Sequence, residues 1–152
     1  MSGSTISRGV TSSERVLQPP AVTAAAPQGV WVIVVNYNTA DLLERCLEAL
    51  RATQLDRPCT VFVVDNGSRD ASVARVRERF PEVVLLETGA NVGFARANNL
   101  ALRRVLAFVP EQVRRAHAVL LVNSDCFVEP ETIQRLVGVL DREPDVAVVG
   151  PK

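Results

Sequence analysis

The sequence is poor in several residue types, and each shortage disfavours a class of protein. Sixteen of its 17 basic residues are Arg, and the single Lys is Lys152, the last of 152 residues. A P-loop places a Gly-Lys pair on its phosphates, and a Schiff-base enzyme needs a Lys inside the fold, so neither class fits. The single His, His117, leaves little room for a Ser-His-Asp triad or a histidine metal site.

Long apolar runs and an excess of one charge are also missing. The longest apolar run, Val30 to Val35, has six residues, whereas a membrane span needs about 20. The 17 basic and 17 acidic residues cancel, and a chain that binds nucleic acid normally has a basic excess. Neither a transmembrane segment nor a nucleic-acid partner is therefore predicted. Three Cys, an odd number without a C-x-x-C pair, fit reduced thiols in a cytoplasmic protein.

Two regions differ in composition. Residues 1–29 contain many Ser, Thr, Pro and Gly but few large apolar residues, which predicts a disordered tail. From residue 30 to 152, short β-branched runs alternate with segments of helical periodicity, and Thr39 and Asp70 stand where two helices begin. The predicted strands are 30–35, 60–64, 83–86, 118–122 and 146–149, and the predicted helices are about 40–50, 71–80, 94–108 and 130–141. This alternation predicts one α/β domain with a mainly parallel sheet and flanking helices.

Polar segments follow four of the predicted strands. They are Asn36-Tyr37-Asn38, Asp65-Asn66-Gly67-Ser68, residues 89–94 and Asn123-Ser124-Asp125. Each alone could be an ordinary turn, since Asn, Asp and Gly favour turns. In open α/β sheets, however, ligands bind outside the carboxyl ends of the strands. Four such segments at one edge therefore predict a binding site there. His117 precedes its strand and is expected at the opposite end, on the surface or in a loop.

The residue types at this edge indicate a nucleoside diphosphate with a divalent cation. The first turn lacks G-x-G-x-x-G, which disfavours a dinucleotide site and a nicotinamide-dependent oxidoreductase. Tyr37 offers a ring on which a base can stack. Asp65 and Asn66 offer a carboxylate and an amide that can hold a base edge or a ribose. Asp125 can hold Mg²⁺ or Mn²⁺ against a diphosphate, and Arg96 can pair with phosphate oxygens or be a solvated helix residue.

The order of these motifs resembles the family 2 glycosyltransferases. The motifs are Asn36-Tyr-Asn38, then Asp65-Asn-Gly-Ser68-x-Asp70, then Asn91-x-Gly93-Phe94-x-x-x-Asn98-Asn99, then Asn123-Ser-Asp125. They are most similar to the rhamnosyltransferase-like bacterial branch, which builds cell-surface polysaccharides, and the resemblance covers residues 30–152. It implies the nucleotide-binding, Rossmann-like half of a fold called GT-A.

The resemblance also implies roles for individual residues. The implied nucleotide-binding set is Asn36, Tyr37, Asn38, Asp65, Asn66, Asn91, Gly93, Arg96 and Asn98. Asn123-Ser124-Asp125 occupies the place of the family's D-x-D motif, so Asp125 is the implied main ligand of Mg²⁺ or Mn²⁺, with Asn123 beside it. Two amides depart from the common pattern, because many members have Asp at the positions of Asn66 and Asn123.

The resemblance implies an enzyme that transfers a sugar from a nucleotide donor, with inversion, to a polysaccharide or a lipid-linked glycan. The donor could be dTDP-rhamnose. Members are considerably longer, and their second half binds the acceptor and supplies the catalytic base. We therefore expect a donor-binding part truncated at its C-terminus, with the base beyond Lys152, since Glu129 and Glu131 fit an ordinary helix start. The alternative is a non-catalytic nucleotide-binding or assembly module.

The resemblance also bears on surroundings and behaviour. A lipid-linked acceptor would place the protein in the cytoplasm, at the inner face of the membrane. The arginines of residues 75–79 and 114–115 are expected on solvated faces, with peripheral contact to anionic lipid as the minor alternative. Apolar surface meant to face a second half would be exposed, which predicts poor solubility or self-association.

Overall fold

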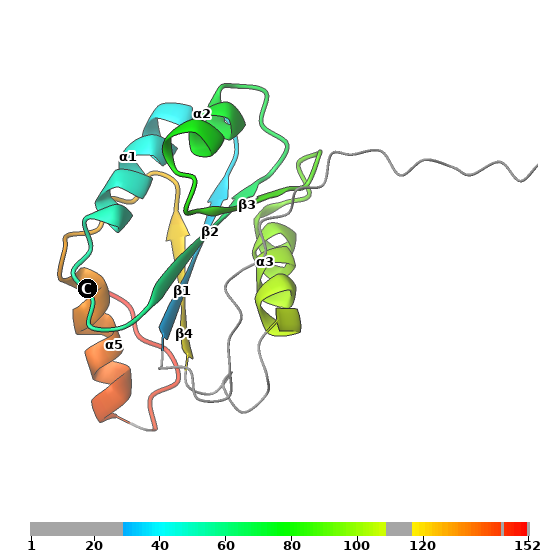
Figure 1. Cartoon of the computed structure of the whole chain (residues 1–152). Coiled ribbons are helices and arrows are strands. Elements are labelled where there is room, and N and C mark those ends of the chain that lie inside the picture. The colour runs from blue at the N-terminus through cyan, green and yellow to red at the C-terminus, as the bar shows by residue number, and fades with distance from the viewer. Residues whose placement is uncertain (1–28, 109–116, 144, 152) are drawn as a thin grey trace, which may run out of the picture.

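A computed structural model describes residues 29–108, 117–143 and 145–151 (Figure 1). The predicted tail, apart from Gly29, and Arg114 and Arg115 lie outside these residues. The elements are β1 (Gly29–Asn36), α1 (Ala40–Arg51), β2 (Cys59–Asp65), α2 (Ser72–Arg79), β3 (Val84–Glu87), α3 (Phe94–Phe108), β4 (His117–Asn123) and α5 (Thr132–Arg142). The helix predicted over residues 94–108 has the predicted bounds. The other elements named here begin and end one or two residues from their predicted positions, except that α1 begins where predicted.

The sheet is parallel, with the strand order β3-β2-β1-β4. The continuous β-branched run of β1 explains its central place, because such a strand can be buried on both faces. The register pairs Asn36 with Asp65, Asp65 with Glu87, and Val35 with Asn123. The carboxyl ends of the strands are therefore level. The predicted α/β fold with a parallel sheet and flanking helices is confirmed.

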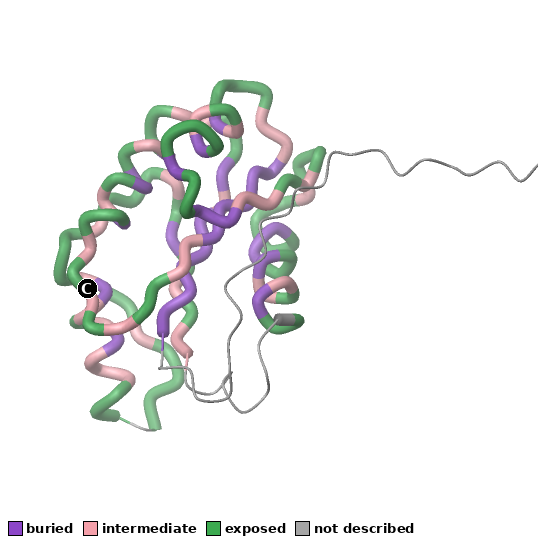
Figure 2. The backbone as a smooth tube through the Cα atoms, in the orientation of Figure 1, coloured by how far each residue is buried: buried purple, intermediate pink, exposed green. Residues whose placement is uncertain are grey.

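Helices cover both faces of the sheet (Figure 1). Alternate residues of β1 point to opposite sides: Val30, Val32 and Val34 pack with α1, α2 and α5, whereas Trp31 and Ile33 pack with α3. The small residues Ala97 and Ala101 allow α3 to lie close to β1 and β2. Figure 2 shows the buried residues concentrated along the strands and on the inner sides of the helices. Both faces of the sheet thus belong to one domain core.

The prediction of a strand over residues 146–149 is wrong. In the structure this segment is irregular, and Val148 is 87% exposed. The amide of Val146 donates to the carbonyl of Glu143, so the chain turns directly after α5 instead of joining the sheet. A β-branched run becomes a strand only where a neighbouring strand pairs with it, and among the described residues none does so here.

One carboxylate serves the start of two helices. Thr39 stands at the N-cap position of α1, as predicted, but its hydroxyl makes no cap hydrogen bond. Instead Asp70 Oδ2 accepts a hydrogen bond from the amide of Ala40 at 2.9 Å, and Asp70 Oδ1 accepts from the amide of Ser72 at 3.0 Å. Desolvation opposes ionisation of Asp70, but hydrogen bonds from Ser72 and Ala40 outweigh it and hold the pKa of the carboxyl below its usual value.

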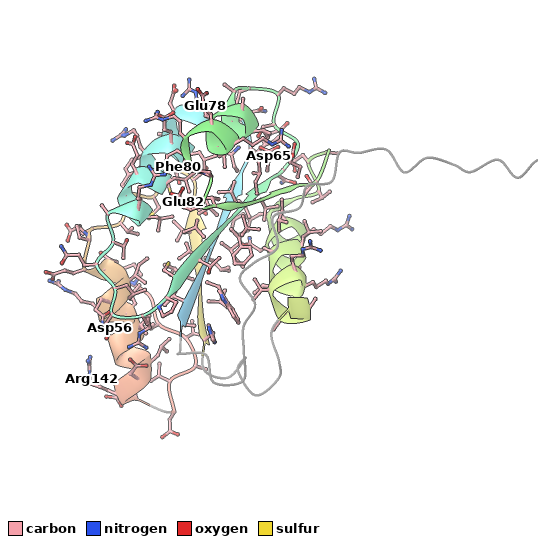
Figure 3. All side chains as sticks on the ribbon, viewed as in Figure 1. Asp56, Asp65, Glu78, Phe80, Glu82 and Arg142 are labelled. Atoms are coloured by element: carbon pink, nitrogen blue, oxygen red, sulfur yellow. The ribbon has the colours of Figure 1, made fainter. Side chains whose placement is uncertain are left out.

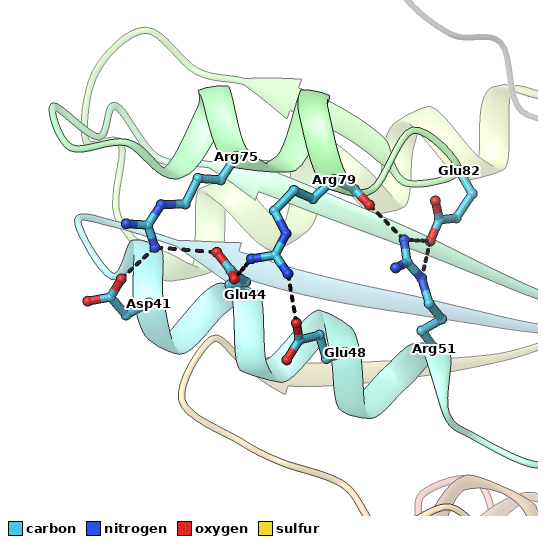
Figure 4. Close-up of polar contacts among 7 residues, drawn as sticks. All are labelled: Asp41, Glu44, Glu48, Arg51, Arg75, Arg79 and Glu82. Carbon is cyan, nitrogen blue, oxygen red and sulfur yellow. Dashed lines mark hydrogen bonds and ion pairs between the residues drawn. The ribbon is translucent and has the colours of Figure 1, made fainter.

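Ion pairs join α1 to α2 along their exposed sides (Figure 4). Arg75 pairs with Asp41 and Glu44, Arg79 with Glu44 and Glu48, and Arg51 with Glu82. Arg77 pairs with Glu87 of β3. The three arginines of residues 75–79 are thus matched by acidic neighbours instead of forming a free basic surface. This matching weighs against contact of that face with anionic lipid.

None of the helices within the described ranges has the length and apolarity needed to cross a membrane.

Candidate functional site

The four polar segments meet at one edge of the sheet, as predicted. Because the strands end level, the residues after β1, β2, β3 and β4 form a single rim. Asp65 lies at this end of the sheet, whereas Asp56 and Arg142 lie at the other (Figure 3). His117 pairs in register with Gly29 and stacks on Trp31 with ring centroids 4.3 Å apart. It is therefore at the end away from the rim, as expected.

Asp65 is the buried centre of the rim. Its side chain is held on both oxygens: Oδ1 accepts from Asn36 Nδ2 at 3.0 Å, and Oδ2 accepts from the amide of Ser68 at 3.0 Å. Asn36 is itself fully buried and also donates to Ser68 Oγ at 3.0 Å. A carboxylate has about four acceptor positions, so Asp65 keeps capacity for a further donor. It is a fixed acceptor at the foot of the site.

Asn66 holds the loop that follows β3. Its Oδ1 accepts from the amide of Val92 at 2.9 Å, and its Nδ2 donates to Asn91 Oδ1 at 3.1 Å. Asn91 Oδ1 also accepts from the amide of Gly93 at 3.0 Å. A carboxylate at position 66 would place two acceptors opposite each other, which explains why this chain has an amide here. The Asn66 and Asn91 side chains therefore shape the loop.

The turn after β1 leaves one ring exposed. Asn38 has a left-handed backbone with φ of 56°. Its side-chain Oδ1 accepts from the backbone N–H of Arg69 at 2.7 Å, and its backbone N–H donates to Ser68 Oγ at 2.9 Å. These bonds fasten the turn to the segment after β2. Tyr37, which precedes Asn38 in this turn, is 48% exposed. Asn38 thus has a positioning contact, and the Tyr37 ring is open to a stacking partner.

The start of α3 contains a buried oxygen to which no described residue donates a hydrogen bond. Asn98 is 5% exposed, and its Nδ2 donates to the carbonyl of Phe94 at 3.0 Å. Its Oδ1 has no hydrogen-bond partner within the described part of the chain. A buried acceptor left unpaired costs about 1–3 kcal/mol, so a ligand hydroxyl or N–H there would be stabilised. Arg96, nearer the helix start, is exposed and forms no ion pair with any described residue.

The end of β4 and the loop after it present Asn123 and Asp125 to solvent. The amide of Cys126 donates to the Asn123 carbonyl at 3.0 Å, and the buried Cys46 thiol lies under the same carbonyl at 3.6 Å. Burial first, and then the nearby charges of Cys126 and Asp125, raises the pKa of Cys46 to about 12. The thiol is therefore neutral packing beneath the loop.

The residues after β4 fit a divalent cation only with help from a ligand. Nowhere in the described ranges do three or more His, Cys, Asp or Glu gather to hold a metal. Asp125 and Asn123 offer one carboxylate and one amide. Mg²⁺ commonly binds one or two carboxylates and completes its shell with water and substrate phosphates. The donor set thus suits Mg²⁺ or Mn²⁺ bound together with a diphosphate.

Three hydroxyls at the rim are not among the site residues predicted from the sequence. Ser68 joins Asn36 to Asn38, and Thr39 Oγ1 donates to Asn36 Oδ1 at 2.7 Å. Thr39 Oγ1 also lies 2.9 Å from Ser124 Oγ in the loop after β4. Their only signal in the sequence is their place, since Ser68 and Ser124 lie within the rim motifs and Thr39 directly follows one. A hydroxyl in a turn is common, so the residue type alone does not single them out.

A hollow of about 1030 Å³ lies elsewhere, along the free edge of β4. Its lining includes Leu102, Val119 and Leu121 together with Leu140 and Val148. None of the predicted site residues lines it. This groove is therefore separate from the rim.

Comparison with known proteins decides the family. The sequence model of glycosyl transferase family 2 matches residues 31–152. The chain belongs to glycosyl transferase family 2. The curated N-acetylglucosaminyl-diphospho-decaprenol L-rhamnosyltransferase of Mycobacterium tuberculosis is 33% identical over 126 residues, which are 79% of this chain and 39% of the relative. The family identified from the rim motifs is thus confirmed.

Solved structures show the same fold. The mannosyltransferase PcManGT of Pyrobaculum calidifontis, in complex with GDP-Man and Mn²⁺, is 29% identical with a TM-score of 0.60, and the match covers 82% of this chain and 34% of that one. Residues 1–349 of S. aureus TarS, in complex with UDP-GlcNAc, match at 22% identity with a TM-score of 0.59, over 82% of this chain and 37% of that one. The chain therefore spans less than half the length of these relatives.

Proposed function

We propose that the rim binds the nucleoside diphosphate of a sugar donor together with Mg²⁺ or Mn²⁺. One observation carries this proposal: the buried Asp65 carboxylate, the exposed Tyr37 ring and the Asp125 carboxylate stand at the same end of the sheet, where three adjacent strands end. A base needs an aromatic face to stack on, a ribose needs fixed acceptors, and a diphosphate needs a cation. Two fold relatives were solved in complex with nucleotide sugars, one of them with Mn²⁺, which supports the same ligand class.

The proposed role of each side chain follows from the atoms that it has available for a ligand. Tyr37 would stack on the base, and Asp65 would accept from a base N–H or a ribose hydroxyl. Asn98 Oδ1 would accept from a further donor, which would remove its unpaired state. Arg96 would pair with phosphate oxygens at the positive end of α3. Asn36, Asn38, Asn66, Asn91 and Gly93 would keep these groups in place.

We infer further that the chain is the donor-binding part of a glycosyltransferase. Transfer with inversion requires a base that takes the proton of the acceptor hydroxyl as it attacks the anomeric carbon. The cation, when bound, stabilises charge on the departing diphosphate. We expect the base in the portion of the relatives that this chain does not cover. No residue of the rim is proposed as the base.

The rhamnosyltransferase relative suggests the substrates. According to its name, that enzyme transfers L-rhamnose to N-acetylglucosaminyl-diphospho-decaprenol, and it is 33% identical to this chain. We therefore propose dTDP-rhamnose as the donor and a lipid-linked glycan or polysaccharide as the acceptor. Such a reaction would take place in the cytoplasm, at the inner face of the membrane.

A second candidate is a nucleotide-binding module without catalysis. The observation that favours it lies in the rim itself, where one carboxylate, Asp125, stands with the amide of Asn123 and no residue is proposed as the base. Both candidates share the rim and its ligand. They differ in turnover: only the enzyme would release the nucleoside diphosphate from a donor sugar when an acceptor is supplied.

Calorimetric titration with dTDP and UDP, with and without Mn²⁺, tests the shared rim. We expect the wild-type chain to bind one of them more tightly with Mn²⁺. Asp125→Ala should weaken metal-dependent binding by more than about tenfold, because even outer-shell partners of a metal contribute that much. Glu129→Ala removes the same charge four residues away and should change little. No binding of either nucleotide by folded wild-type protein would contradict the proposal.

A further inference from the structure

A chain of side-chain hydrogen bonds crosses the rim from β2 to the loop after β4. Asn36 Nδ2 donates to Asp65 Oδ1 at 3.0 Å, and Thr39 Oγ1 donates to Asn36 Oδ1 at 2.7 Å. Thr39 Oγ1 then lies 2.9 Å from Ser124 Oγ, a residue 85 positions further along the chain. These bonds thus connect the buried carboxylate of the rim to the residue next to Asp125.

Helix formation does not explain the Thr39 hydroxyl. Thr39 occupies the N-cap position of α1, where a hydroxyl ordinarily accepts from a helix amide. Here its side chain makes no such bond, and the amide of Ala40 donates to Asp70 instead. The hydroxyl is therefore available to Asn36 and Ser124, and both of these contacts lie within the rim.

The direction of every bond in the series is fixed by chemistry. A carboxylate only accepts, so Asn36 must present its NH₂ group to Asp65 and its oxygen to Thr39. That oxygen also only accepts, so the Thr39 proton is committed to Asn36. The remaining contact then has Ser124 as donor and Thr39 as acceptor. With its proton turned inward, Ser124 Oγ is left with its acceptor lone pairs for other partners.

We propose that Thr39 is a positioning residue that couples the nucleoside end of the rim to its cation end. Through Asn36 it joins Asp65 to Ser124, and it holds the Ser124 hydroxyl as an acceptor beside Asp125. A cation near Asp125 is thereby favoured when the rim is in the arrangement that also holds a nucleoside. The inference rests on the proposed nucleotide and metal site, and it adds a residue that the motif comparison did not single out.

The first test measures the coupling itself. In calorimetric titration, the coupling is the factor by which Mn²⁺ tightens nucleotide binding. Thr39→Val keeps the shape and removes the hydroxyl, and it should lower this factor about fivefold or more, at the low end of typical coupling between sites. Thr39→Ser keeps the hydroxyl and should restore it. Ser124→Ala should act like Thr39→Val, and combining the two should add little further loss.

Thr53→Val is the matched control. Thr53 lies just past the other end of α1, and its hydroxyl donates to the Ala49 carbonyl at 3.4 Å. The change is chemically the same but far from the rim, so the coupling should stay at the wild-type value. If both Val variants lose stability but only Thr39→Val loses coupling, the loss of coupling is not caused by a general weakening of α1.

The second test needs no ligand. Amide hydrogen exchange of residues 124–126 should be faster in Thr39→Val than in the wild type, and unchanged in Thr39→Ser and Thr53→Val. If wild-type protein binds with Mn²⁺ dependence and Thr39→Val keeps both the coupling and the exchange rates, the inference is overturned and the proposed function stands. If wild-type protein does not bind nucleotide, the proposed function fails, and with it the coupling.

Discussion

Gly67 shows how a single residue lets two rim loops approach each other. Its φ is +78°, and a Cβ built there would lie 2.6 Å from the carbonyl carbon of Ala90 and 2.9 Å from the amide nitrogen of Asn91. Both contacts are with backbone, so no side-chain rotation can relieve them. The loop after β3 can lie against the turn after β2 only because position 67 has no side chain.

We therefore expect Gly67→Ala to lower the free energy of unfolding by about 2–3 kcal/mol, since it adds a backbone clash to the cost of a left-handed residue. Gly89→Ala is the control, because Gly89 has a similar φ of +72° but nothing lies within 4 Å of the point that its Cβ would occupy. It should lose only about 1 kcal/mol. Urea unfolding of both variants checks this. Equal losses would show that the close approach to Ala90 does not matter.

At this scale the sequence predicts which residues reach the rim better than what they do there. The polar types at the strand ends suffice to place Asp65, Asn66 and Asp125 at one edge. They do not show that the Asn66 amide is used by Asn91 and Val92, because that depends on how closely two loops pack. For the same reason the sequence indicates Thr39 as a helix cap, while the group that performs this role is Asp70, which lies 30 residues after Ala40, the residue whose amide it accepts from.

At the scale of elements, Asp70 ties together the starts of α1 and α2. Its two oxygens accept from the first amide of each helix, Ala40 and Ser72. Asp70→Ala should therefore lower the free energy of unfolding at pH 7 by about 1–2 kcal/mol, the usual effect of losing a cap. Asp41→Ala removes an exposed carboxylate from the first turn of α1 and should cost about 0.5 kcal/mol.

The effect of Asp70 should depend on pH in a defined direction. Its pKa in the folded protein lies below the ordinary value, so its contribution is present above about pH 4. It is lost as the pH falls through the folded pKa. Urea unfolding at pH 7 and pH 2.5 should show the difference between wild type and Asp70→Ala shrinking at the lower pH. A difference that grows on acidification would contradict this account.

Local patterns predict most of the elements, because apolar residues at helical or strand spacing line one face of an element and that face is buried in the structure. The leucines of α1 recur at helical spacing, and Leu43, Leu47 and Leu50 are buried against the sheet. The run of residues 146–149 has equally good strand residues but, among the described residues, no neighbouring strand. A propensity is local, whereas a strand needs a partner, so this error could not be avoided by looking at the run alone.

At the scale of the whole molecule, the β4 part of one sheet face is uncovered within the described residues. On the side of α3, that helix packs on β1 and β2, and no residue of β4 joins its core cluster. Val119 and Leu121 of β4 are therefore exposed, Leu121 by 50%. An unpaired edge strand with apolar side chains is a surface on which chains associate. The structure thus locates the surface on which we expect self-association.

Sedimentation velocity at increasing protein concentration should show association of the wild-type chain. Leu121→Glu should reduce it, because a charge on this face has to be dehydrated in the contact. Leu100→Glu is the control, since Leu100 is a comparably exposed leucine on α3, 42% accessible. A wild-type chain that stays monomeric at all concentrations would contradict the expectation.

The level ends of the strands have a consequence for how the chain tolerates insertions. The register that pairs Asn36 with Asp65 also directs Val32 and Val34 into the core. One extra residue within β1 would turn its two faces over and move Asn36 out of reach of Asp65 in the same step. An extra residue in the connection 52–58, at the other end of the sheet, leaves every strand pair unchanged. Length variation can therefore accumulate at one end of this domain, while the other end must keep its count of residues.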